Sequence, residues 1–172
     1  MGYVNNNNKE LNPHEIILGI DQSFSNTGFC VYDCQTIIEA SCISTKNDKS
    51  LEERIQIIVK EMLIIIKRYD IKQVVIEGMS FASMQASIRQ LAGLFYVILY
   101  ELNKKKIKYD IIPPLTLKKA VTGSGKATKQ EMIDKVELRE QMILSDQSNI
   151  KIGAKKFEDI VDSYWLSRYY NL

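Results

Sequence analysis

Hydrophobic residues in the first half of the chain gather in short continuous runs, the pattern of strands buried in a sheet. Three runs separated by short turn-like links predict an antiparallel meander: residues 16–21, 28–33 and 37–45. Two further buried strands are expected at 74–77 and 109–112, and Pro113 and Pro114 end the last one. The pattern therefore predicts five strands, of which the first three are neighbours.

Elsewhere, apolar residues recur at the three-and-four spacing of amphipathic helices. Ser50 and Glu53 form a capping box, which predicts a helix from there to about Tyr69. Further helices are expected over about residues 83–105, 115–121, 128–144 and 155–169. Three strands followed by alternating helices and strands are typical of an α/β fold.

The composition fits one globular domain. The 172 residues are 45% hydrophobic and 26% charged, enough for one core and too few for a second full domain. We expect residues 15–172 to form this domain and the asparagine-rich residues 1–14 to be a disordered leader without signal-peptide pattern. The longest apolar run, 91–100, is half of the ~20 residues that a membrane span needs. These features predict a cytoplasmic protein, of a bacterial cell or of an infected host.

Charge and cysteine content narrow the possible chemistry. The net charge of +2 is too small to prove a nucleic-acid partner, but lysines crowd residues 104–135, as a DNA-backbone surface or as a solvated face. Cys30, Cys34 and Cys42 lie in strand-like segments without the spacing of a disulfide framework or a zinc site. The only histidine, His14, lies in the leader, so a metal ion would have to be held by carboxylates.

Two of the expected buried strands end in a carboxylate: Ile-Ile-Leu-Gly-Ile-Asp21 and Gln-Val-Val-Ile-Glu77. A buried carboxylate is costly unless a cation or hydrogen bonds offset its desolvation. Asp21 could instead cap the turn at residues 23–27, whereas Glu77 is a poor turn former. If the two strands are parallel neighbours, the carboxylates emerge side by side and repel, and a divalent metal ion would hold both ionised.

Asp159 and Asp162 are three residues apart on the last expected helix and therefore share one of its faces. The apolar stripe of that helix lies on roughly the opposite side: Phe157, Ile160, Val161, Tyr164 and Trp165. Taken alone, the pair is also what an exposed acidic helix face would show.

The order and spacing of these four carboxylates resemble the RuvC family of Holliday junction resolvases. The resemblance extends from about Ile16 to Ser167, and the turn Ser-Phe-Ser-Asn-Thr-Gly-Phe after Asp21 is similar to the first hairpin of that family. It implies a ribonuclease-H-like α/β fold, with a five-stranded mixed sheet whose first three strands are antiparallel and with helices on both faces. The asparagine- and lysine-rich composition is compatible with a phage-encoded member.

The same resemblance implies an endonuclease that resolves four-way junctions, and other branched DNA, by paired symmetrical nicks. Asp21, Glu77, Asp159 and Asp162 would hold two Mg²⁺ ions, for which Mn²⁺ can substitute, with Asp21 bridging them, and the reaction would be two-metal hydrolysis of the phosphodiester. The residues do not indicate whether a branch-migration motor is a partner.

Lysines around the Gly-Ser-Gly turn extend the resemblance. Lys118 and Lys129 fall on functional lysines of the family, where they would hold the scissile phosphate, although Lys119 could replace Lys118 after a one-residue slip. Lys119 and Lys126 would add contacts to DNA. The alternative is that Lys118 and Lys129 are both surface lysines at helix ends.

Two features depart from the family pattern. Phe81 lies one position later than the family's aromatic residue near the junction crossover; it could stack on an unpaired base, a contact of about 1 to 3 kcal/mol, or pack in the core. The helix pair is flanked by Glu158, Tyr164 and Trp165 instead of small apolar residues, so Glu158 could compete as a metal ligand.

The run at residues 91–100 is apolar around a whole helix, and one sheet can cover only one side of it. We therefore expect a homodimer, as the resemblance also implies. Leu94→Glu or Val97→Glu should dissociate it if either residue faces the partner.

Three other functions fit part of the pattern. Gly-Ile-Asp before a Ser/Thr/Asn/Gly turn resembles the first phosphate loop of actin- or Hsp70-like ATPases, but these need two related domains. A junction-binding module without catalysis and a ribonuclease H would share the fold, and the complete set of four carboxylates disfavours the former.

Overall fold

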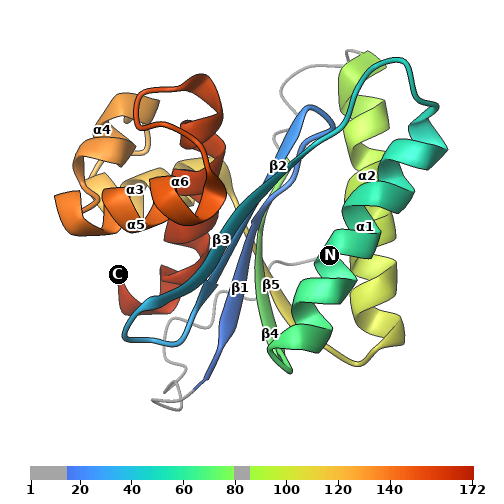
Figure 1. Ribbon diagram of the computed structural model, residues 1–172, viewed down its shortest axis with the longest axis horizontal. Helices are drawn as coiled ribbons and strands as arrows, with labels where there is room; N and C mark the ends of the chain where they lie inside the picture. Colours follow the sequence, from blue (N-terminus) through green and yellow to red (C-terminus); the bar gives the residue numbers. More distant parts are fainter. Residues whose placement is uncertain (1–14, 80–85) are drawn as a thin grey trace.

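A computed structural model describes residues 15–79 and 86–172 of the chain. These residues form a five-stranded sheet with helices on both faces (Figure 1). The expected leader, residues 1–14, and Phe81 lie outside the described residues. Within the part that is described, no helix is long and apolar enough to cross a bilayer.

The sheet combines antiparallel and parallel pairing. Its strands are β1 (Ile17–Asp21), β2 (Asn26–Tyr32), β3 (Ile37–Ser44), β4 (Gln73–Glu77) and β5 (Lys108–Ile112). Their spatial order is β3-β2-β1-β4-β5. The first three strands are antiparallel, whereas β4 runs parallel to β1 and β5 parallel to β4. This confirms the predicted mixed sheet and brings the carboxyl ends of β1 and β4 to the same edge.

Helices cover the two faces unequally (Figure 1). In the part of the chain that the structure describes, one face carries the two long helices α1 (Leu51–Arg68) and α2 (Ala86–Lys104). The other face carries the shorter ones: α3 (Pro114–Thr122), α4 (Lys129–Asp134), α5 (Leu138–Ser148) and α6 (Lys155–Ser167), which a 3₁₀ turn at Tyr169–Asn171 follows. Of these, α6 packs directly on β1 and β2.

The pleat of the strands divides the core in two, because successive side chains of a strand point to opposite faces. In β1, Leu18 and Ile20 pack with α1 and α2, whereas Ile17 packs with α6. In β4, Ile76 likewise packs with α1 and α2. The next residue of each strand therefore turns toward the α6 face, and in β1 that residue is Asp21.

Two glycines allow α6 to touch the sheet backbone. A Cβ atom on Gly19 would lie 2.0 Å from the carbonyl oxygen of Ser163, and one on Gly28 would lie 2.3 Å from that of Asp159. Neither approach is possible for a residue with a side chain. As a result α6 is buried along most of its length. The buried residues include an acidic one, Asp162, which is 3% exposed.

The predicted capping box is confirmed, since Ser50 with Glu53 opens α1. A second capping box, Thr128 with Glu131, opens α4. The cysteines are free, as expected. Cys34, however, lies in the turn after β2 with a φ of 70°, and not in a strand.

The expected single helix at 128–144 is wrong, because the structure has α4 and α5 there. The chain turns at 135–137 and so places Val136, which is 3% exposed, in the core. Gln141 Nε2 donates to the carbonyl oxygen of Val136 at 2.9 Å and so holds the turn. The last helix ends at Ser167, two residues earlier than expected, because the 3₁₀ turn follows.

The outer surface of α2 corrects one expectation about the dimer. Leu94 is fully buried between α2 and the sheet, so it cannot face a partner, and Leu94→Glu would disrupt the core. The exposed side of α2 carries Tyr96 and Tyr100, which are 62% and 63% exposed, with the partly buried Val97 beside them.

Candidate active site

Asp21 and Glu77 end neighbouring parallel strands. Ile20 pairs with Ile76 in the β1–β4 register, so the two carboxylates follow at adjacent positions of one edge. Strand alternation turns both toward α6. Asp21 is only 7% exposed, although it is the last residue of its strand.

The turn after β1 closes without the Asp21 carboxylate. Thr27 Oγ1 donates to the carbonyl oxygen of Ser23 at 2.6 Å, and Ser23 Oγ donates to the carbonyl oxygen of Asn26 at 3.0 Å. Among the described residues, these side chains supply the hydrogen bonds that fix the turn. The geometry therefore does not support turn capping as the reason for an acidic residue at Asp21.

Helix α6 brings Asp159 and Asp162 to the same place. Gly28 is the register partner of Asp21 in β2, and the Asp159 backbone lies against that glycine. Lys129, the first residue of α4, donates a hydrogen bond from Nζ to the Asp162 carboxylate. Because Asp162 is buried and paired, the exposed-face interpretation of the helix pair does not hold for it.

The carboxyl groups affect one another. Burial raises the pKa of Asp21 well above its ordinary value, the charges of Glu77 and Asp159 raise it further, and Lys129 opposes them. Burial also raises the pKa of Glu77, against the charges of Lys129 and Lys118. The pKa of Asp159 is raised as well, again by burial first. Additional positive charge at this edge would favour the ionised forms.

The four candidate lysines separate in space. Lys129 pairs with Asp162, and the charge of Lys118 acts on Glu77. Lys119 and Lys126 are exposed, and among the described residues neither forms an ion pair with the carboxylates. The geometry therefore favours Lys118 over Lys119 as the second basic residue of the site.

Sequence reasoning missed two polar residues here. Gln22, directly after Asp21, is 5% exposed, and its Nε2 donates to the backbone carbonyl oxygen of Glu77 at 2.8 Å. Lys156 lies at the start of α6, where Nζ donates to Ser44 Oγ at 2.9 Å, and its charge opposes the rise in the pKa of Asp159. A polar residue immediately after a buried strand was the available signal for Gln22; Lys156 had none.

The donor set fits a divalent cation with oxygen ligands. The four carboxylates do not form a complete ligand set in this structure. No three Asp, Glu, His or Cys side chains of the described residues have the spacing of a metal cluster. Two observations nevertheless favour a cation: the raised pKa values of the carboxyl groups, and a buried acceptor, Gln22 Oε1, that has no donor within the described residues. Glu158 is half-buried beside Asp159, and its charge raises the pKa of Asp159. This effect is smaller than the opposing effect of the Lys129 charge.

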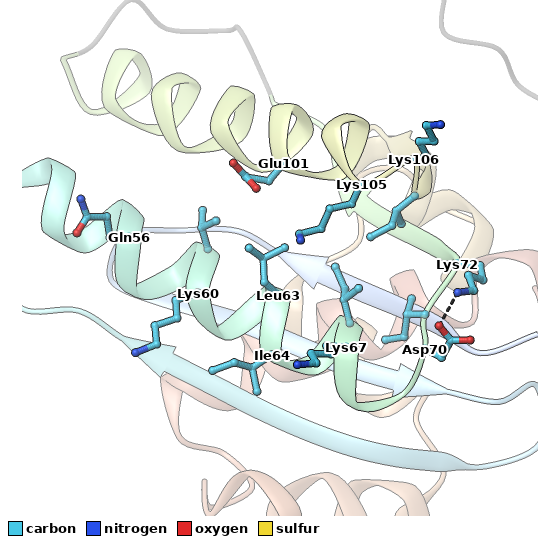
Figure 2. A pocket seen from close by; sticks show the side chains of 14 residues that line it. Gln56, Lys60, Leu63, Ile64, Lys67, Asp70, Lys72, Glu101, Lys105 and Lys106 are labelled. Carbon is cyan, nitrogen blue, oxygen red and sulfur yellow. Dashed lines mark hydrogen bonds and ion pairs between the residues drawn. The ribbon is translucent and has the colours of Figure 1, made fainter.

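The lysine-rich segment does not form one surface. Lys108 pairs with Gln73 at the start of β4, the end of the sheet opposite Glu77. Lys105 and Lys106 line a hollow of about 980 Å³ between α1 and the C-terminal end of α2, together with Lys72, which is paired with Asp70 (Figure 2). This hollow contains none of the candidate site residues. Of the lysines in residues 104–135, those whose charges act on the carboxylates, Lys118 and Lys129, lie in α3 and α4.

Comparison with known proteins identifies a family. A family model described as "Crossover junction endodeoxyribonuclease RuvC" matches residues 17–153. The chain is 34% identical over 120 residues to the crossover junction endodeoxyribonuclease RuvC of Sulfurovum sp. (strain NBC37-1), covering 67% of this chain and 75% of the relative. It is 32% identical over 124 residues to that of Prochlorococcus marinus (strain NATL1A), covering 69% and 79%. The family match ends before α6.

Solved structures share the fold through nearly the whole chain. The RuvC structure of Thermus thermophilus has a TM-score of 0.69 at 17% identity, covering 90% of this chain and 93% of the other. A structure of T. thermophilus RuvC in complex with a Holliday junction substrate has a TM-score of 0.66 at 15% identity, covering 91% and 94%.

Proposed function

The chain belongs to the RuvC family of crossover junction endodeoxyribonucleases, and we propose that it cuts four-way DNA junctions at two symmetrical positions. One observation carries the chemistry: the buried Asp21 and the half-buried Glu77 end adjacent parallel strands against a helix that bears a third and a fourth carboxylate. Family membership disfavours the ATPase alternative.

We assign metal binding to Asp21, Glu77, Asp159 and Asp162. Two Mg²⁺ ions, for which Mn²⁺ can substitute, would supply activation of the attacking water and stabilisation of the departing 3′ oxygen. Asp21 lies between the other strand-end carboxylate and α6, and its pKa responds to Glu77 and to Asp159, which suits a bridging ligand.

Lys129 and Lys118 have a different role, because they bring positive charge to the edge where the carboxylates gather. In the structure Lys129 is the counter-ion of Asp162. A cation held by the carboxylates would take over that neutralisation and leave the Lys129 ammonium group to bind the scissile phosphate. The charge of Lys118 lowers the pKa of Glu77 without forming an ion pair with it, so Lys118 would also be available to the phosphate. Lys119 and Lys126 would contact DNA further from the cut.

We further propose a homodimer formed through the exposed side of α2. Tyr96 and Tyr100 are large aromatic residues on one helix face, the type of residue that is enriched at interfaces. A two-fold dimer would present two sites related by the symmetry of the opposed strands of a junction. Tyr96→Glu with Tyr100→Glu should give a monomer in sedimentation at micromolar concentration, whereas a wild-type monomer there would contradict the proposal.

The site of action is proposed as the cytoplasm. A DNA substrate and three free cysteines fit a reducing compartment.

The decisive experiment offers the purified protein a synthetic four-way junction beside a linear duplex of the same sequence. We expect Mg²⁺-dependent nicks at matching positions of two opposed strands, no cutting in EDTA, and a mostly intact linear duplex. An RNA/DNA hybrid in the same series tests the ribonuclease H alternative. Binding without cutting would indicate a non-catalytic junction-binding module, and equal cutting of the linear duplex would indicate a general nuclease.

A further inference from the structure

The side chain of Gln22 connects the two strand ends that carry the acidic pair. It follows Asp21 at the end of β1, and its Nε2 donates to the backbone carbonyl oxygen of Glu77 at the end of β4. A carbonyl oxygen can only accept, so this bond fixes which end of the carboxamide is nitrogen and which is oxygen. The acceptor atom of Gln22 is therefore Oε1.

Oε1 is buried and accepts no hydrogen bond from the described residues. A buried acceptor is rarely left without a partner, because it gives up its hydrogen bonds to water. The atom to which Nε2 bonds, the backbone carbonyl oxygen of Glu77, can only accept. The carboxyl groups of Asp21 and Glu77 are also acceptors only when they are ionised, the form in which they would bind a metal ion.

We propose that Gln22 Oε1 is a neutral oxygen ligand of the divalent ion that Asp21 and Glu77 hold. Amide oxygens of Gln are among the ligands of hard cations such as Mg²⁺. Because the group is uncharged, it adds a ligand without adding to the repulsion between the neighbouring carboxylates of Asp21 and Glu77. The inference rests on the metal-dependent function proposed above and names a further residue of that site.

Gln22 could also act only as a clamp between β1 and β4, through the bond to Glu77. Two variants separate these roles. Gln22→Met keeps the length and bulk of the side chain but has no oxygen and no N–H. Gln22→Glu has no N–H either and, when ionised, no donor at all, yet it keeps oxygen atoms at the same reach. Both variants therefore lose the clamp, and only Gln22→Met loses the ligand.

The test is a titration with Mn²⁺ in the absence of DNA, in which free Mn²⁺ is followed by its electron paramagnetic resonance signal. We expect Gln22→Met to bind Mn²⁺ at least about tenfold more weakly than the wild type, the scale of losing a supporting group at a metal site. Gln22→Glu should bind as tightly as the wild type or more tightly. Gln56→Met, on the exposed surface of α1, is the matched control and should be unchanged.

Thermal melts in EDTA verify that each variant is folded. If Gln22→Met does not fold, Gln22→Asn replaces it, because it withdraws the oxygen by one methylene and should also weaken Mn²⁺ binding. Equal affinity losses in Gln22→Met and Gln22→Glu would reduce Gln22 to a clamp, and unchanged affinity in both would overturn the proposal.

The outcome is separable from that of the proposed function. If the wild-type protein binds Mn²⁺ through Gln22 but leaves junctions uncut, the proposed resolvase activity is wrong and Gln22 remains a metal ligand. If the wild-type protein cuts junctions with Mn²⁺ and Gln22→Met binds the ion normally, Gln22 is not a ligand and the proposed activity stands. A wild-type protein that binds no Mn²⁺ would contradict both.

Discussion

The two faces of the sheet use the same strands for different purposes. On the face of α1 and α2, contact is made by large apolar side chains, and Ile58, Met62 and Ile65 are fully buried there. On the face of α6, the closest contacts are between backbones at Gly19 and Gly28. The first face contributes stability through buried apolar area. On the second face, glycines replace larger side chains, so α6 lies close enough to the strands for its carboxylates to approach those of Asp21 and Glu77.

The alternation of side chains along each strand separates the two cores. Within β1, each residue that supports one core is followed by a residue of the other, so Asp21 can be buried among polar neighbours while Ile20 remains in an apolar core. Changes on the α6 face should therefore affect chemistry first, and changes on the other face should affect stability first.

The largest expected effect follows from removing charge on the α6 face. Asp21→Asn, Glu77→Gln, Asp159→Asn or Asp162→Asn should each lower junction cleavage at least about a hundredfold, the scale for a preorganised electrostatic group. Junction binding should persist, because it rests on lysines and falls with salt. Cleavage rates and gel-shift affinities at several salt concentrations measure both.

Glu158→Gln is the control for this series, since it removes a half-buried carboxylate next to Asp159. It should leave cleavage near the wild-type rate. Full activity in Asp159→Asn or Asp162→Asn would give the helix pair a structural role, and loss of activity in Glu158→Gln would add a ligand.

The next effect belongs to the opposite face. Ile65 is fully buried, so Ile65→Ala should lower the free energy of unfolding by about 2 to 5 kcal/mol. Urea denaturation measures the loss. Cleavage per folded molecule and Mn²⁺ affinity should not change, and a parallel fall in metal affinity would show that the two faces are not independent.

A smaller stability effect is expected where α6 touches β2. In Gly28→Ala the new Cβ would meet the Asp159 carbonyl oxygen, so α6 must shift, at a cost of about 1 to 3 kcal/mol in unfolding free energy. Cleavage should fall as well, since Asp159 moves with the helix. Gly93→Ala is the control: Gly93 is exposed in α2 and nothing lies within 4 Å of its added Cβ. The free energy of unfolding of Gly93→Ala should rise by up to about 1 kcal/mol. Wild-type cleavage by Gly28→Ala would show that the close contact between α6 and β2 is not needed.

These residues also mark what could be predicted from the sequence. The strand-end position of Asp21 and Glu77 was predictable, because runs of apolar residues and their ends are local patterns. The burial of Asp162 was not, because it depends on two glycines about 140 residues away along the chain that admit α6 to the sheet. The break at 135–137 was also missed, since no Gly or Pro marks it and only the burial of Val136 explains it.

The smallest expected effect is a dependence of stability on pH that a metal ion reverses. In the metal-free protein the pKa values of Asp21, Glu77 and Asp159 are raised above their unfolded values, mainly by burial. The folded state therefore binds protons more tightly than the unfolded state does. The stability from these groups is fully present below the unfolded pKa values, about 4, and is lost as pH rises through the higher folded values.

Mg²⁺ favours the ionised carboxylates, so its stabilising effect should grow over the same range of pH. Melting temperatures from pH 4 upward, in EDTA and in Mg²⁺, should therefore diverge as pH rises in the wild type. In Asp21→Asn the melting temperature in EDTA should fall less with rising pH, because one buried acid no longer has to ionise. Carboxylates away from this edge titrate equally in both proteins, so the difference between them reports Asp21 together with its effect on Glu77. A wild-type melting temperature in EDTA that rises with pH more steeply than that of Asp21→Asn would contradict the raised pKa of Asp21, and with it the electrostatic basis for a cation at this edge.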